Sequence, residues 1–296
     1  MYTVNASFEQ FHDSVNITGD HRQICSSRKD ALIDHLKNKF RIEDSFQFGS
    51  IPKYTALRGL SDLDILLVLN WGMHCENRTP SQVMLSVRNC LSAYKTVGAR
   101  RNGQAVTVRY ETWPNVDIVP AYKVLIPGTT QVQYYCIPDM NTETWIKSKP
   151  SNHATSIESR VRSFGGEFRK IIKLMKWWNH THGDYLESYH IEALAVESLT
   201  GVFSEWAWDV CDLFDKMYNS ISSCNLLLPC FSYQGSYADA YLRSSDRTEV
   251  SKRLLTAKNN AQSAWYAGNF RNPNPSDALA IECWRRVFGD KFPAYG

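Results

Sequence analysis

The chain has 296 residues, which is enough for one large domain or two small ones. Its composition, 43% hydrophobic and 21% charged, is that of an ordinary soluble globular protein. A formal net charge of +3 is too small to indicate a protein that binds long nucleic acid along its surface. No apolar run approaches the roughly 18 residues of a membrane span, and no signal peptide is recognisable, so we expect a cytoplasmic protein.

The first half of the chain mixes helical and extended patterns. Apolar residues at Leu32, Leu36 and Phe40 predict an amphipathic helix over residues 28–40. Further along, one helix is expected at 81–94, and short apolar or alternating runs predict strands at 45–48, 63–69, 105–110 and 116–122. The even apolar character of 63–69 indicates a strand buried on both faces.

The second half of the chain is helical in pattern. Helices are predicted over 156–181, 189–200, 203–219, 244–267 and 276–288. The segment around Pro150, rich in Ser, Asn and Lys, is a plausible crossing point between the halves. We therefore expect an α+β, bilobed protein with a mixed-sheet lobe over 1–154, a helical lobe over 155–296 and a cleft between them.

The eight cysteines show no Cys-x-x-Cys pair. In a chain of this length without a signal peptide, reduced thiols are expected rather than disulfides or a structural zinc site.

Two carboxylates, Asp62 and Asp64, stand at the head of the 63–69 strand. Residues at i and i+2 of a strand face the same side, so these like charges would repel unless a cation lay between them. Oxygen-only ligands of this kind suit Mg²⁺. An isolated Asp-x-Asp is more often a solvated strand end, so the pair alone does not establish a site.

Two further features strengthen the metal-site interpretation. Gly49 and Ser50 form a turn after the preceding strand, and a turn that opens a short helix can offer backbone N–H groups and a hydroxyl to a phosphate. Asp117 supplies a third acid near the start of another apolar strand. Three acids and a phosphate cradle together predict a two-metal site.

The pattern "FGS…SDLDILLVL…VDIVPAY" resembles the signature of DNA polymerase β-type nucleotidyltransferases. Within that superfamily the chain resembles the CD-NTases (cGAS/DncV-like nucleotidyltransferases), which are related to oligoadenylate synthases. The narrower likeness rests on the stretches "IPDMNTETWIKSKPSNH", "FRKIIKLMKWWNHTHGDYLESYHIEALAVE" and "AIECWRRVFGDKFPAY".

The resemblance implies roles for individual residues. Asp62, Asp64 and Asp117 would be catalytic and bind two Mg²⁺ ions, for which Mn²⁺ can substitute. Nucleotide binding would use Gly49, Ser50, Lys176, Ser188 and Tyr189, with Lys176 and Ser188 on the triphosphate and Tyr189 stacked on the base. From the residues alone, Tyr189 could equally be a core or lobe-interface tyrosine, and the basic helix face of Arg169, Lys173 and Lys176 is expected to be solvated.

The resemblance also implies a bacterial anti-phage (CBASS) enzyme that makes cyclic di- or trinucleotides from NTPs such as ATP and GTP. Its partners would be a downstream effector activated by the product and, through Gly296, conjugation machinery; a frayed end is the simpler interpretation of that terminus. Absence of a Cys/His zinc cluster argues against activation by DNA. Two rival functions remain: nucleotidyl transfer to an RNA end, a protein or a small molecule, and a catalytically silent nucleotide-sensing module.

Overall fold

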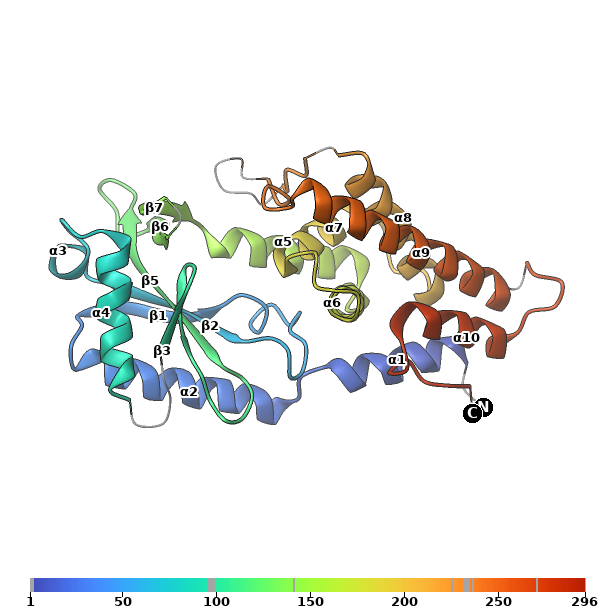
Figure 1. Ribbon diagram of the computed structural model, residues 1–296, viewed down its shortest axis with the longest axis horizontal. Helices are drawn as coiled ribbons and strands as arrows, with labels where there is room; N and C mark the ends of the chain where they lie inside the picture. Colours follow the sequence, from blue (N-terminus) through green and yellow to red (C-terminus); the bar gives the residue numbers. More distant parts are fainter. Residues whose placement is uncertain are drawn as a thin grey trace. The chain divides into compact units, whose positions relative to one another are not determined.

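The computed structural model describes residues 3–94, 99–140, 142–224, 226–230, 235, 237–269 and 271–295. The chain forms two compact units, each described here by itself (Figure 1). The sheet unit is Ile17–Asn152, and the helical unit combines Met1–Asn16 with His153–Gly296. No helix in the described part of the chain has both the length and the apolar character that a membrane span requires.

A mixed sheet forms the centre of the sheet unit, as the strand patterns predicted. Its strands follow the order β1-β2-β5-β4-β3, and β6 pairs with both β5 and β7. Only the β2–β5 pairing is parallel among the described pairs; the others are antiparallel. The strands are β1 (Ile42–Phe48), β2 (Leu63–Leu69), β3 (Ala99–Asn102), β4 (Ala105–Val108), β5 (Val116–Leu125), β6 (Val132–Asp139) and β7 (Thr144–Ser148).

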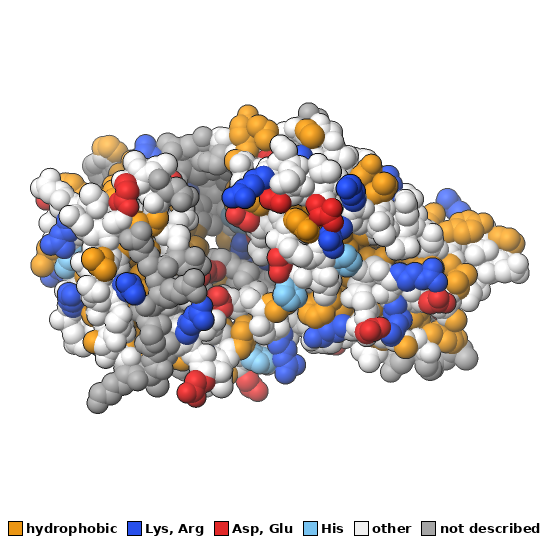
Figure 2. All heavy atoms as spheres, viewed as in Figure 1, with side chains coloured by type: hydrophobic (Ala, Val, Ile, Leu, Met, Phe, Trp, Pro, Cys, Tyr) orange, Lys and Arg blue, Asp and Glu red, His pale blue; other side chains and the backbone are white. Residues whose placement is uncertain are grey.

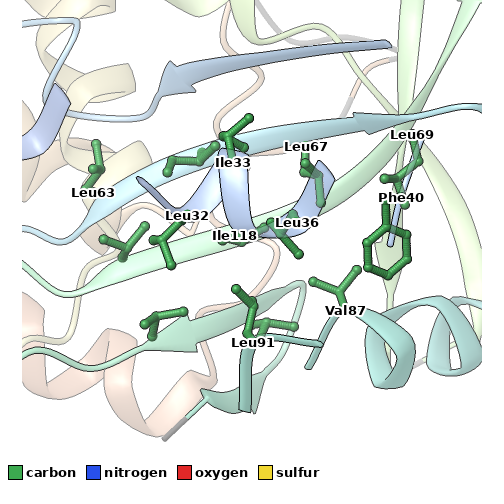
Figure 3. Packing of buried hydrophobic residues seen from close by; sticks show 14 of the residues in the cluster. Leu32, Ile33, Leu36, Phe40, Leu63, Leu67, Leu69, Val87, Leu91 and Ile118 are labelled. Carbon is green, nitrogen blue, oxygen red and sulfur yellow. The ribbon is translucent and has the colours of Figure 1, made fainter. Parts of the chain in front are cut away.

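Strand β2 is buried on both faces, which confirms the expectation from its apolar run. Alternate residues of a strand point to opposite faces, so Leu63 and Leu67 enter one cluster whereas Leu66 and Val68 enter another. Helices α2 (Gly19–Lys37) and α4 (Pro80–Ser92) pack against the first cluster, with Leu32 and Leu36 from α2 and Val87 and Leu91 from α4, as Figure 3 shows. The short α3 (Trp71–His74) follows β2 directly.

The helical unit is organised around aromatic side chains. Phe8 is fully buried and lies with its ring centroid 4.9 Å from that of Trp284, 5.1 Å from that of Phe292 and 5.5 Å from that of Trp206. The helices are α1 (Val4–Val15), α5 (Pro150–Phe164), α6 (Glu167–Thr181), α7 (Ser188–Ser198), α8 (Trp206–Ser222), α9 (Ser244–Gly268) and α10 (Asp277–Phe288).

The surface of this unit carries both signs of charge. On the face drawn in Figure 2, Lys and Arg side chains alternate with Asp and Glu side chains over the helices. Several are paired, for example Arg253 with Glu249 at 3.0 Å and Arg286 with Glu282 at 2.6 Å. Interspersed charges of this kind agree with the small net charge of the chain.

Several sequence expectations require correction. Residues 1–16 belong with the helical unit and not with the sheet lobe, because Phe8 and Phe11 of α1 pack into its aromatic core. The boundary falls between Asn152 and His153. The helix expected over 156–181 is two helices, separated at Gly165, whose φ of +118° a helix cannot contain.

Other elements were not predicted from the sequence, or were predicted differently. Strands β3, β6 and β7 and helix α1 had no counterpart among the expected elements. After Ser50 the chain continues as a turn through residue 54 and does not open a helix. The amide of Thr55 closes this turn by donating to the Ser50 carbonyl at 3.0 Å.

Candidate active site

The three predicted acids converge at one end of two neighbouring strands. In the parallel β2–β5 pairing, Asp64 is the register partner of Asp117. Asp62 directly precedes β2, where the amide of Leu63 donates to the carbonyl of Asn115 at 2.9 Å. Parallel pairing therefore brings together residues more than fifty positions apart in the sequence, as the position of Asp117 at the start of an apolar strand predicted.

Asp117 is held by a neighbour on the adjacent strand. Thr107 of β4 is its antiparallel register partner, and the Thr107 hydroxyl donates to Asp117 Oδ1 at 2.5 Å. This contact fixes one carboxylate oxygen of Asp117. Thr107 was not singled out from the sequence, although its place in the alternating run "AVTVRY" marks it as facing opposite to the apolar residues.

The pKa of Asp62 is raised by its surroundings, which include a second acid. Burial raises the pKa of Asp62, and the negative charge of Asp117 raises it further. Hydrogen bonds from Asn115 act in the opposite direction. Burial and the neighbouring charge thus disfavour the ionised form of Asp62, and a nearby cation would stabilise that form. The electrostatics therefore suit a positively charged ligand.

Gly49 lies against Asp64 so closely that no side chain would fit. Its φ is +73°, a conformation that glycine adopts without strain. A Cβ atom at this position would lie 2.8 Å from Asp64 Cγ and would overlap Oδ2. The glycine of the predicted Gly-Ser turn therefore makes room for the Asp64 carboxylate, while Ser50 follows it in the turn.

The donor set fits a divalent metal ion by its chemistry. All three side chains offer carboxylate oxygens, the ligands that Mg²⁺ prefers. Among the described residues, however, no three acidic, His or Cys side chains lie close enough together to form a ready-made metal site. The assignment of Asp62, Asp64 and Asp117 as metal ligands therefore remains a prediction.

In the helical unit the predicted triphosphate residue Lys176 is buried. It lies on α6 with 5% of its surface exposed, and its Nζ pairs with Glu192 Oε1 of α7 at 2.7 Å. Lys173 is also buried, and Arg169 pairs with Glu158. The expectation of a solvated basic face is therefore wrong for Lys173 and Lys176, which are buried, whereas Arg169 is half-buried. Lys176 pairs with a carboxylate, and Lys173 donates to the side-chain oxygen of Asn16 at 2.6 Å.

Ser188 and Tyr189 begin helix α7. Ser188 is its first residue, and Tyr189 is 36% exposed, so its ring is not a core residue. The Tyr189 ring lies edge-on to His153, with centroids 5.0 Å apart and planes at 76°. Partial exposure of this kind is compatible with stacking on a base. The nucleotide-binding roles of Lys176, Ser188 and Tyr189 stay predictions.

Comparison with known proteins identifies the family. Residues 1–160, which include Gly49, Ser50 and the three acids, match the family model of SMODS, the Second Messenger Oligonucleotide or Dinucleotide Synthetase domain. The chain belongs to the SMODS family. The match covers more than half of the chain and confirms the resemblance to the CD-NTases.

The curated relatives have low sequence identity to this chain, but the alignments cover most of both chains. The chain is 23% identical to a probable cyclic nucleotide synthase of Bacillus cereus (strain VD146), over 99% of this chain and 98% of the relative. It is 24% identical to a cyclic AMP-AMP-AMP synthase of Acinetobacter sp., over 91% of this chain and 79% of the relative. With the family match, these make the chain a nucleotidyltransferase that produces cyclic oligonucleotides.

Solved structures share the fold. The CdnC chain of an Escherichia coli MS115-1 CdnC:HORMA complex superposes with a TM-score of 0.77 and 17% identity, over 98% of both chains. Vibrio cholerae DncV with a linear intermediate gives 0.65 and 13%, over 98% of this chain and 86% of the other. The expected polymerase β-like, α+β nucleotidyltransferase fold is confirmed.

Proposed function

We propose that the enzyme makes a cyclic di- or trinucleotide second messenger from NTPs and acts in anti-phage (CBASS) defence. The observation that carries the chemistry is the register pairing of Asp64 with Asp117, with Asp62 at the head of β2 and a glycine against Asp64. The Acinetobacter relative is a cyclic AMP-AMP-AMP synthase and E. coli CdnC has been solved with ATP, which favours ATP among the substrates.

In each transfer an acceptor hydroxyl oxygen forms a bond to the α-phosphorus of an NTP, the bond from that phosphorus to the bridging oxygen breaks, and pyrophosphate leaves. Two divalent cations, when bound, would lower the pKa of the hydroxyl and stabilise charge on the leaving group. Asp62, Asp64 and Asp117 would hold them, and Asp117, which accepts a hydrogen bond from Thr107 at one oxygen, would accept the hydroxyl proton at the other. Ring closure repeats the transfer on the linear intermediate.

The test is an incubation of purified protein with all four NTPs, each labelled in turn at the α-phosphate, with Mg²⁺ or Mn²⁺. Products are treated with phosphatase and identified by mass spectrometry. The wild type is compared with the Asp62→Ala/Asp64→Ala double variant. Asp44→Ala is the matched control, since Asp44 is exposed on β1 and pairs with Val68 toward the far end of β2.

A phosphatase-resistant product formed by the wild type and the control, and absent from the double variant, is expected. A label that is phosphatase-resistant only when an RNA, a protein or a small molecule is added would instead support transfer to another acceptor. Absence of any transfer under every condition would support the silent nucleotide-sensing alternative.

We also propose a downstream effector that binds the cyclic product, and conjugation at Gly296. Gly296 lies outside the described residues, so the second proposal rests on the family likeness alone. Mass spectrometry of protein co-expressed with its neighbouring genes should show an adduct at Gly296, and a free carboxylate in every molecule would refute conjugation.

A further inference from the structure

Three helices of the helical unit meet at one buried carboxylate that the sequence did not single out. Glu192 on α7 is 1% exposed. Its Oε1 lies 2.7 Å from Nζ of Lys176 on α6, and its Oε2 lies 3.0 Å from Nε2 of His153 on α5. One carboxylate oxygen thus accepts a hydrogen bond from the ammonium group on α6, and the other lies within ion-pair distance of an imidazole nitrogen on α5, without hydrogen-bond geometry.

The position of Glu192 on α7 connects it to the predicted nucleotide-binding residues. Ser188 and Glu192 are four residues apart, and Tyr189 and Glu192 are three apart, so all three lie on neighbouring positions of one helix face. The His153 ring contacts Tyr189 as well as Glu192. One carboxylate therefore joins the lysine predicted for the triphosphate to the helix that carries the other two residues.

A buried carboxylate at this point is costly unless it is paired, because taking a charge out of water carries a large desolvation penalty. A lysine side chain has four rotatable bonds, and fixing its ammonium group costs conformational entropy. When the protein itself fixes that group before the ligand arrives, the ligand does not meet the cost on binding. The Glu192 contact has this effect on Lys176.

We propose that Glu192 is a positioning residue for triphosphate binding: buried on α7 beside His153, it holds the ammonium group of Lys176 in place for the phosphates. The proposal rests on the proposed function, in which Lys176 contacts the triphosphate. Glu192 itself touches no substrate. Because the triphosphate is held before and during transfer, loss of the contact should raise KM and leave kcat nearly unchanged.

The experiment measures equilibrium binding of ATP and of GTP without turnover, in the presence of Ca²⁺, and uses AMP and GMP as probes that lack the outer phosphates. The variants are Glu192→Gln, Lys176→Gln and the double variant. Glu249→Gln is the matched control, since Glu249 is in an exposed i,i+4 ion pair with Arg253 in the same unit. Thermal melting verifies that each variant is folded.

We expect Lys176→Gln and Glu192→Gln each to weaken NTP binding about tenfold, with a change of less than about twofold in monophosphate binding and in kcat. The double variant should bind no more weakly than Lys176→Gln alone, because Glu192 acts through Lys176. The control should match the wild type. Additive losses, equal losses for NTP and monophosphate, or wild-type affinity in Glu192→Gln would each overturn the proposal.

Glu192→Asp keeps the test decisive if Glu192→Gln does not fold. Aspartate retains the buried charge but is one methylene shorter, so it cannot reach Lys176 and His153 at once. We expect NTP binding between those of the wild type and Lys176→Gln, and wild-type affinity would overturn the positioning role.

The outcome also separates this inference from the proposed function. Product formation that depends on Asp62 and Asp64, together with wild-type NTP binding by Lys176→Gln, would refute the inference and leave the function standing. Failure to form any product would refute the proposed function. The NTP affinities of the Glu192 and Lys176 variants are measured without turnover, so they would still test the positioning role of Glu192 independently.

Discussion

The sheet unit and the helical unit differ in how they arrange charge at their predicted functional residues. At the head of β2, Asp62, Asp64 and Asp117 bring like charges together, and the pKa of Asp62 rises as a result of burial and of Asp117. In the helical unit, Lys176 faces Glu192 and Arg247 faces Asp239, so opposite charges are buried in pairs.

The difference shows what each arrangement is suited to do. Clustered acids store unfavourable electrostatic energy that a bound cation relieves, so they suit ligand binding more than stability. Paired buried charges fix side-chain geometry, and breaking one partner leaves an uncompensated charge. The two units should therefore respond in opposite directions when a charge is removed.

The largest effect is expected where a buried pair of the helical unit is broken. Asp239 is 2% exposed at its side chain, accepts from Arg247 Nη2 at 2.7 Å and from the amide of Leu227 at 3.0 Å. Asp239→Asn should lower the free energy of unfolding by about 3 kcal/mol, measured by urea denaturation. Asp290→Asn removes the partner of Arg285 at a fully exposed site and should change the free energy of unfolding far less, because solvent screens the pair. Equal costs at the two sites would contradict the comparison.

A smaller effect, on activity, is expected from Gly49→Ala. The new methyl group would overlap Asp64 and displace its carboxylate, so the rate of nucleotidyl transfer should fall about a hundredfold. Gly59→Ala is the control, because Gly59 has a similar φ of +77° but nothing within 4 Å of the added carbon. Both variants carry the same backbone strain, so an equal loss of activity would show that strain, and not the contact with Asp64, is responsible.

The loss of folding stability at acidic pH should come from a buried histidine of the helical unit. Burial lowers the pKa of His190, which is hydrogen-bonded to the Tyr241 hydroxyl at 3.1 Å, from 6.5 to about 4. Between these values the unfolded chain binds the proton and the folded chain does not, so stability present above about pH 6.5 is lost as the pH falls toward 4. The loss should be on the order of 2–3 kcal/mol.

Urea denaturation across that pH range measures the effect. His190→Gln should reduce the pH dependence and leave the part contributed by His12 and His182, whose pKa values burial also lowers. His180→Gln, at an exposed histidine of the same unit, should keep the wild-type slope. A wild-type slope in His190→Gln would assign the acid sensitivity elsewhere.

The smallest expected effect has the opposite sign and lies in the sheet unit. Asp62→Asn removes a half-buried charge that Asp117 repels. In EDTA at neutral pH the variant should be more stable by less than about 1 kcal/mol, because solvent screens a partly exposed carboxylate. Because the pKa of Asp62 is raised in the folded state, the folded wild type binds the proton more readily, and the difference should shrink as the pH falls. Asp44→Asn should show no such gain in thermal melting. A less stable Asp62→Asn variant would contradict the like-charge interpretation.

Much of the sheet unit could be predicted from sequence. The apolar run of β2 indicated a strand buried on both faces, and the positions of Asp62, Asp64 and Asp117 at the heads of two strands predicted their convergence. The family could also be inferred, because its signature depends on local residue types and spacing. These features can be predicted from the sequence because strand alternation and turn conformation depend on a few neighbouring residues.

Other features depended on contacts between distant segments. The burial of Lys173 and Lys176 was not visible in their helical spacing, since a basic stripe has the same spacing whether it faces water or polar partners on other segments, such as Asn16 for Lys173 and Glu192 for Lys176. The role of Phe8 in assigning α1 to the helical unit, and the meeting of His153, Lys176 and Glu192, likewise depend on packing. The sequence by itself determined the family, the three acids and the glycine turn, whereas the tertiary structure decided which charges are compensated, because compensation requires a partner brought close by the fold.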